Sequence, residues 1–111
     1  MDQVIHAIAE ARRRAILQLV WDAEQPAGEI AAHFAVTRPA ISQHLRVLKD
    51  AGLVTERRQG TRRLYRAVPA RMAELRTFLE EFWNNEQAAS AAAGPEDPDG
   101  SRWRRLRLRP G

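Results

Sequence analysis

The chain has 111 residues, 44% hydrophobic and 29% charged, which is the composition of a single globular domain. It contains no cysteine, which excludes thiolate metal sites, disulfides and thiol redox switching. No apolar run approaches the ~20 residues of a membrane span, and the N-terminus lacks the features of a signal peptide. We therefore expect a soluble cytoplasmic protein with no membrane partner.

Positive charge is concentrated in one part of the chain. The net charge is +4, but residues 37–66 alone carry seven arginines and one lysine against two acidic residues, a net +6. The rest of residues 1–88 has five arginines against nine acidic residues. A basic segment on an acidic body predicts a polyanionic partner. The plainer alternative is a solvated basic face without a partner.

The first third of the chain predicts three short helices. The first has Ile5 and Ile8 on one face, and the second carries an apolar group over Ile16–Trp21. Pro26 breaks the second pattern, because proline cannot continue a helix. A third helix is expected over Ala27–Phe34, followed by a connection of about three residues.

The next helix has clear signals at both ends. Thr37 can cap its first turn through the side-chain hydroxyl, and Gly52 suits the left-handed position that ends a helix. Spacings of four and three residues place one apolar stripe toward the core, formed by Ile41, Leu45 and Leu48. We therefore predict a helix over Thr37–Ala51.

The opposite face of this helix carries polar groups that can recognise base edges. Ser42, Gln43 and Arg46 share it over about two turns. Gln pairs with adenine at two atoms and Arg with guanine at two, so the face suits a DNA major groove. With the preceding short helix it forms a helix-turn-helix pattern. An ordinary solvated helix face is the alternative.

A hairpin with an arginine-rich end follows. Strands are expected over about Leu53–Gln59 and Arg62–Val68, joined at Gly60-Thr61. The charged side chains flanking the turn are Arg57, Arg58, Arg62 and Arg63. Without a partner these charges repel one another, whereas DNA phosphates would attract them. The hairpin is therefore interpreted as the wing of a winged helix-turn-helix.

The last helix, beginning at Pro69, predicts self-association. Large apolar residues recur along it at spacings of three and four, which is typical of a seam for a partner helix. We expect a homodimer through the first and last helices, with the interface formed by Ile5, Ile8, Leu75, Phe78, Leu79, Phe82 and Trp83. A two-fold dimer predicts an inverted-repeat operator.

The sequence changes character near Gln87. Residues 1–87 are expected to form the DNA-binding and dimerisation domain, and residues 88–111 a disordered basic tail. The tail has three interpretations: it is without function, its five arginines add phosphate contacts, or Trp103, Leu106 and Leu108 touch a membrane.

Two stretches, "AIAEARRRAILQLV" and "AGEIAAHFAVTRPAISQHLRVLKDAGLVTERRQGTRRLYRAV", resemble the ArsR/SmtB family of bacterial dimeric repressors. The resemblance covers about residues 4–85. It implies a mainly α fold with a small β-hairpin, a winged helix-turn-helix. It implies a DNA face on or near Thr37, Arg38, Ser42, Gln43, His44 and Arg46. It also implies a DNA-binding wing formed by Arg57, Arg58, Thr61, Arg62 and Arg63.

The chain departs from the family pattern in two places. Ala11-Arg12 stands where the family usually has Pro-Thr. Metal-sensing members carry cysteines in the third helix or Asp and His along the last, and neither pattern occurs here. His33 and Glu29 share a helix face, but two ligands do not complete a zinc shell. The resemblance therefore indicates a branch that does not sense metal, and we expect no metal or cofactor.

The function expected is sequence-specific binding of double-stranded DNA by a transcriptional regulator, a repressor of an inverted-repeat operator. Two alternatives stay open: a metal-responsive repressor of the same family, and a winged-helix module that docks on proteins without reading DNA. We expect no enzyme, because no nucleophile–base pair, Gly-rich phosphate loop or carboxylate cluster is recognisable. Neither an effector nor an operator sequence can be inferred from the residues.

Overall fold

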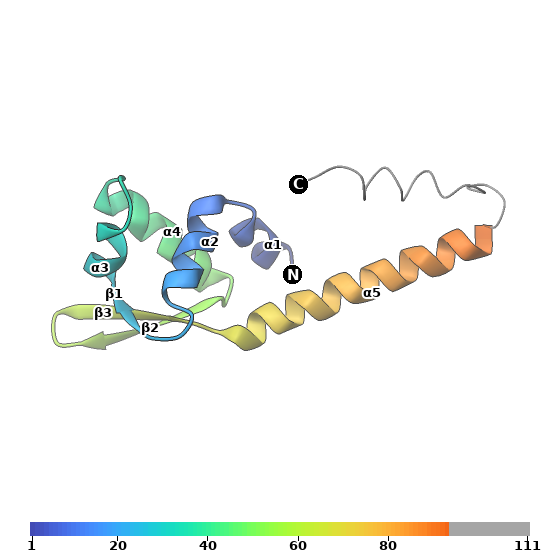
Figure 1. Ribbon diagram of the computed structural model, residues 1–111. Helices are drawn as coiled ribbons and strands as arrows, with labels where there is room; N and C mark the ends of the chain where they lie inside the picture. The colour runs from blue at the N-terminus through green and yellow to red at the C-terminus, as the bar shows by residue number, and fades with distance from the viewer. Residues whose placement is uncertain (94–111) are drawn as a thin grey trace. The chain divides into compact units, whose positions relative to one another are not determined.

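The computed structural model describes residues 1–93 of the chain, and side chains up to residue 89. The chain divides into two compact units, residues 1–76 and residues 77–111. The elements in order are α1 (Asp2–Ile8), α2 (Ala11–Leu19), β1 (Gln25–Pro26), α3 (Ala27–Ala32), α4 (Arg38–Asp50), β2 (Val54–Gln59), β3 (Arg62–Ala67) and α5 (Pro69–Ala93). In Figure 1, α1 to α4 lie together on one side of the β2–β3 hairpin. The expectation of a mainly helical chain with a small β-hairpin is confirmed.

Both ends of α4 are fixed by the residues that the sequence indicated. The Thr37 hydroxyl accepts a hydrogen bond from the Ala40 amide at 3.2 Å. At the other end Gly52 has a φ of +78°, which a residue with a Cβ rarely adopts. The Gly52 amide donates to the Lys49 carbonyl and the Leu53 amide to the Leu48 carbonyl, both at 2.9 Å. This is a Schellman motif, and it turns the chain directly into β2.

The three strands form an antiparallel sheet in the order β1-β3-β2. β2 and β3 pair from Val54↔Ala67 to Gln59↔Arg62, and Gly60 takes a φ of +63° in the turn. β1 was not predicted. It has two residues, paired as Gln25↔Tyr65 and Pro26↔Leu64. Proline is tolerated there because β1 is an edge strand.

The core of residues 1–76 is one apolar cluster to which every helix contributes. It contains Val4, Ala7, Ile16, Leu17, Val20, Ile30, Ala31, Ile41, Leu45, Leu48, Ala51, Leu53, Val54, Tyr65, Ala67 and Leu75. The apolar stripe of α4 lies at its centre, with each of the three side chains at most 1% exposed. This burial holds α4 by one face and leaves its polar face outward.

Helix α5 differs from its prediction in two respects. Leu75, expected at the dimer interface, is only 4% exposed and belongs to the core. The helix continues to Ala93, six residues beyond the expected boundary at Gln87, because the alanines of this stretch favour helix. The remaining tail, residues 94–111, lies outside the described residues, and so do its proposed phosphate and membrane contacts. Among residues 1–93, no helix combines the length and apolar character needed to cross a membrane.

Candidate nucleic-acid interface

A polar groove lies between α3, α4 and the hairpin. It encloses about 860 Å³, and its walls combine side chains from elements far apart in the sequence. From α4 come Arg38, Ser42, Gln43, Arg46, Lys49 and Asp50, and from the hairpin come Glu56, Thr61, Arg62, Arg63 and Tyr65. Seven of the eleven residues expected to bind DNA are therefore gathered in one place: Arg38, Ser42, Gln43, Arg46, Thr61, Arg62 and Arg63.

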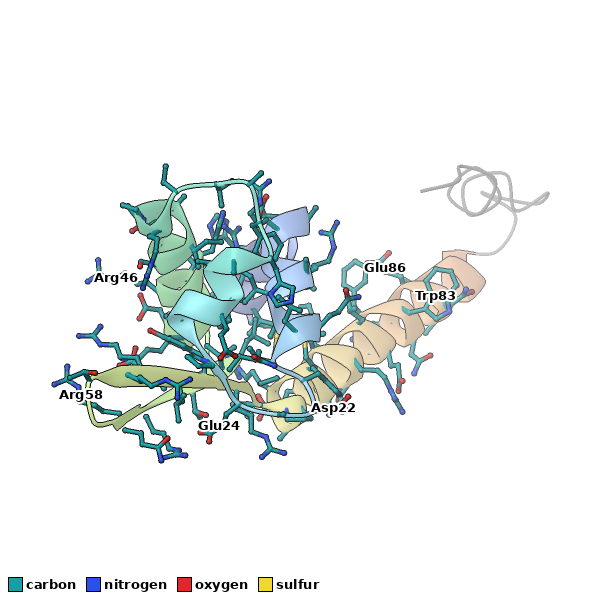
Figure 2. The ribbon with its side chains drawn as sticks, turned by 60° about the vertical axis from the view of Figure 1, so that its left-hand side comes forward. Asp22, Glu24, Arg46, Arg58, Trp83 and Glu86 are labelled. Atoms are coloured by element: carbon teal, nitrogen blue, oxygen red, sulfur yellow. The ribbon has the colours of Figure 1, made fainter. Side chains whose placement is uncertain are left out.

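The two faces of the hairpin carry different arginines. The register pairs Glu56 with Tyr65 and Arg58 with Arg63, and side chains alternate along each strand. Arg58 and Arg63 therefore share the face of Tyr65, which is a core residue. Arg57 belongs to the opposite face. Figure 2 shows Arg58 near the end of the hairpin and Arg46 on the outside of α4, on the same side of the molecule.

Arg57 is held by an acid that precedes β1. Its Nε donates to Glu24 Oε2 at 2.7 Å and its Nη2 to Glu24 Oε1 at 2.8 Å, a two-point contact. The hydrogen bond from Arg57 lowers the pKa of the Glu24 carboxyl and raises that of the guanidinium. This contact ties β2 to the segment before β1, so Arg57 has a structural partner away from the groove.

Other acids pair with basic groups around the groove. Arg62 Nη2 lies 3.6 Å from Glu29 Oε1 of α3, and Lys49 Nζ lies 3.8 Å from Glu56 Oε1. Tyr65 donates a hydrogen bond to Glu56 Oε2 at 2.7 Å, which lowers the pKa of that carboxyl. Burial, together with this hydrogen bond, raises the pKa of Tyr65 to about 12. The groove therefore has a net basic lining in which part of the charge is already paired.

Four of the predicted DNA-binding residues do not line the groove. Thr37 caps α4, and Arg57 is held by Glu24. Arg58 lies near the end of the hairpin. His44 faces α2, where its Nδ1 lies 3.4 Å from Arg13 Nη1, and its side chain is only 19% exposed.

Sequence reasoning missed Arg13, although a signal was present. Arg13 precedes Ile16 by three positions, Leu17 by four and Val20 by seven, so it falls on the apolar stripe of α2. A charge on that stripe indicates a buried guanidinium with partners. Its hydrogen bonds need the tertiary structure, because they join α2 to α1 and α4.

The apolar residues predicted for a dimer interface are mostly exposed. Exposed fractions are 39% for Ile5 and Phe78, 51% for Leu79, 56% for Phe82 and 39% for Trp83. Ile8 packs partly on the core and lines an apolar hollow of about 500 Å³, together with Leu17, Trp21 and Met72. Across the described part of the chain, no group of three or more His, Asp or Glu side chains could hold a metal ion.

Comparison with known proteins agrees with this architecture. Residues 10–56 match the family described as "Bacterial regulatory protein, arsR family". The chain is 46% identical over 82 residues to the HTH-type transcriptional regulator Rv2034 of Mycobacterium tuberculosis, covering 74% of this chain and 77% of that protein. It is 42% identical over 60 residues to the transcriptional repressor SdpR of Bacillus subtilis, covering 54% and 67%. The chain belongs to the arsR family.

Solved structures of arsR-type regulators share the fold. One, a possible transcriptional regulator for arsenical resistance, matches 86% of this chain and 99% of its own with 45% identity and a TM-score of 0.68. Another is the homodimeric winged helix-turn-helix DNA-binding domain Mb0332 from Mycobacterium bovis, with 34% identity, 75% and 80% coverage and a TM-score of 0.59. This arsR-family chain is a DNA-binding transcriptional regulator with a winged helix-turn-helix, and the protein-docking alternative is not favoured.

Proposed function

We propose that the chain acts as a homodimeric repressor that binds an inverted-repeat operator. In this proposal α4 enters the major groove as the recognition helix. The hairpin acts as the wing and contacts the sugar-phosphate backbone. The observation that carries the proposal is the convergence of Ser42, Gln43 and Arg46 with Arg62 and Arg63 on one groove.

The division of roles follows from the chemistry of the side chains. Gln43 and Arg46 can each make two-point contacts with a base edge, which discriminate among base pairs by ~1–3 kcal/mol each. The wing arginines Arg58, Arg62 and Arg63 suit phosphate oxygens, which are the same at every base pair. Sequence preference is therefore assigned to α4, and sequence-independent affinity to the hairpin. Arg57 contributes to that affinity only after its hydrogen bonds to Glu24 are broken.

Dimerisation is supported by the exposed apolar side chains. Phe78, Leu79, Phe82 and Trp83 are each at least 39% exposed, and Ile5 of α1 is equally accessible. Burying a large apolar side chain contributes about 1.5–3 kcal/mol, so a second copy that covers the exposed side chains of α5 gains substantial free energy. A solved relative, the homodimeric domain Mb0332, supports a dimer.

The test is a selection of bound sequences from a random pool of double-stranded DNA at near-physiological salt, with sedimentation of the same protein. We expect a dimer and an enriched inverted repeat whose half-sites are about one helical turn apart, or a multiple of it. Retention of DNA without any motif would contradict specific recognition by α4. A monomer that enriches a single half-site would contradict the proposed dimer but would still support α4 as the recognition helix.

We propose that residues 1–93 suffice for specific binding. Under this proposal a chain that ends at Ala93 enriches the same DNA sequence as the full chain. A smaller dependence of affinity on salt for the shortened chain would show that the arginines of residues 94–111 contact phosphates. An altered base preference would contradict the assignment of specificity to α4.

A further inference from the structure

Arg13 of α2 is a charged side chain inside the packed unit, with only 9% of its surface exposed. Its Nε donates to the Ala7 carbonyl at 2.7 Å, and its Nη2 donates to the His6 carbonyl at 3.0 Å. Both carbonyls belong to the last turn of α1, and the His6 carbonyl also accepts from the amide of the C-cap residue Ala9 at 3.3 Å. The guanidinium therefore closes the C-terminal end of α1 and complements its dipole.

The third nitrogen of the same guanidinium faces α4. Arg13 Nη1 lies 3.4 Å from His44 Nδ1. Because arginine has only donors, this contact requires that His44 Nδ1 accept, which places the ring proton of a neutral His44 on Nε2. Glu10, which caps α2 by accepting from the Arg13 amide at 3.0 Å, has Oε2 3.9 Å from the same Nδ1.

We propose that Arg13 is a positioning residue for DNA recognition, joining the end of α1 to α4 through His44. His44 follows Gln43 directly and precedes Arg46 by two positions, so a turn or slide of α4 at His44 moves the side chains that read bases. The apolar contacts of α4 with the core have no preferred direction, whereas a hydrogen bond fixes distance and angle. This inference rests on the proposal that α4 reads DNA.

The charged groups near the His44 ring are Arg13 and Glu10, from α2 and its cap, while α1 contributes the backbone carbonyls that Arg13 binds. The contact between Arg13 and His44 therefore joins all three helices, α1, α2 and α4.

Arg14 is a matched control beside Arg13. It lies on the same helix, carries the same charge, and donates to another α1 carbonyl, that of Ile8, at 2.7 Å. It is exposed, and this hydrogen bond joins it to α1 rather than to α4. Arg13→Gln and Arg14→Gln remove the same charge and each weaken the end of α1, but only the first breaks the link to His44.

The experiment uses the full chain and two duplexes, the inverted repeat enriched from the random pool and a scrambled duplex of equal length. Arg13→Gln is expected to weaken binding of the enriched duplex about tenfold, while binding of the scrambled duplex stays within about twofold. Arg14→Gln is expected to change neither. Equal weakening by both variants, or equal loss on both duplexes, would overturn the positioning role.

His44 provides a second test that holds if Arg13→Gln fails to fold. His44→Gln retains a side-chain oxygen that can accept from Arg13 and should keep specific binding, whereas His44→Leu should lose it. Equal behaviour of the two His44 variants would contradict the inference.

Nitrogen NMR of the His44 ring tests the contact without DNA. We expect a neutral ring protonated on Nε2 at pH 8, with an Nδ1 resonance that shifts in Arg13→Gln and stays in Arg14→Gln. A proton on Nδ1 would overturn the inference whatever the DNA result. An intact contact without any enriched duplex would instead overturn the proposed function, and with it the role of Arg13 in recognition.

Discussion

Helix α4 and the β2–β3 hairpin bring basic side chains to the same groove under different electrostatic conditions. Within residues 1–93, no acid forms an ion pair with Arg46 of α4. On the hairpin, Arg62 lines the groove and pairs with Glu29, while Arg57 lies outside the groove and is held by Glu24. The helix therefore presents an arginine ready for a base, whereas these hairpin arginines must exchange one anionic partner for another. Arginines of the same basic segment therefore differ in how much free energy their contacts add to DNA binding.

The largest expected effect comes from removing the burial that holds α4. Leu48 is fully buried at the centre of the core, so Leu48→Ala should lower the free energy of unfolding by about 2–5 kcal/mol. Urea unfolding followed by circular dichroism measures this change. Loss of DNA binding should follow unfolding, and a variant that stays folded and stable would show that the core does not fix the helix.

A comparison of Arg46→Ala with Arg58→Ala distinguishes base recognition by α4 from sequence-independent phosphate contact by the hairpin. Arg46→Ala should reduce discrimination at one base pair by ~1–3 kcal/mol. Arg58→Ala should weaken all duplexes similarly and reduce the slope of affinity against salt by about one charge. Titrations of the enriched duplex and its single-base variants at several salt concentrations measure both. A changed base preference in Arg58→Ala would reverse the assigned roles.

Alkaline pH should loosen the attachment of the hairpin to the core. The pKa of Tyr65 is raised to about 12 in the folded state, mainly by burial and by its hydrogen bond to Glu56. Its contribution is therefore complete below the unfolded pKa of about 10 and is lost as pH rises through about 12, on the order of 1–2 kcal/mol. Thermal unfolding from pH 9 to 12 measures it. Tyr65→Phe should flatten this part of the profile, and an unchanged slope would contradict the assignment.

The smallest expected effect concerns the acid that faces the wing. Glu29→Gln releases Arg62 from an exposed pair, so affinity for every duplex should rise by less than about 1 kcal/mol without a change in base preference. Glu74→Gln is the control, because Glu74 pairs with Arg71 instead. An equal rise of DNA affinity in both variants would indicate a general charge effect. It would contradict the inference that pairing with acids limits what the hairpin arginines add to binding.

Where local rules suffice, the elements were predictable from sequence. Thr37 and Gly52 marked the ends of α4 because a hydroxyl cap and a left-handed glycine act within a few residues of themselves. The strand pair was predicted to within a residue or two because alternating side chains flank a two-residue turn. β1 was missed because two residues, one of them proline, carry no periodic signal.

The candidate site was predictable in part for the same reason. Ser42, Gln43 and Arg46 were placed on one face by helix geometry alone, and they do line the groove. His44 differs from Gln43 by one position, so the helix turns it toward Arg13 and Glu10. Arg57 differs from Arg58 by one position, so the strand turns it to the other face of the sheet. In both cases the decisive partner lies more than thirty residues away in sequence or comes from a separate element.

The helix-turn-helix and hairpin, the apolar face that each buries and the basic character of residues 37–66 all follow from the sequence alone. These features follow from periodicity, caps and charge, which depend on neighbours in the chain. The pairing of charges, the place of Leu75 in the core and the link from α1 to α4 through Arg13 depend instead on how the chain folds in three dimensions. Ion pairs and buried hydrogen bonds act over a few ångströms between distant segments, and no local pattern encodes that distance.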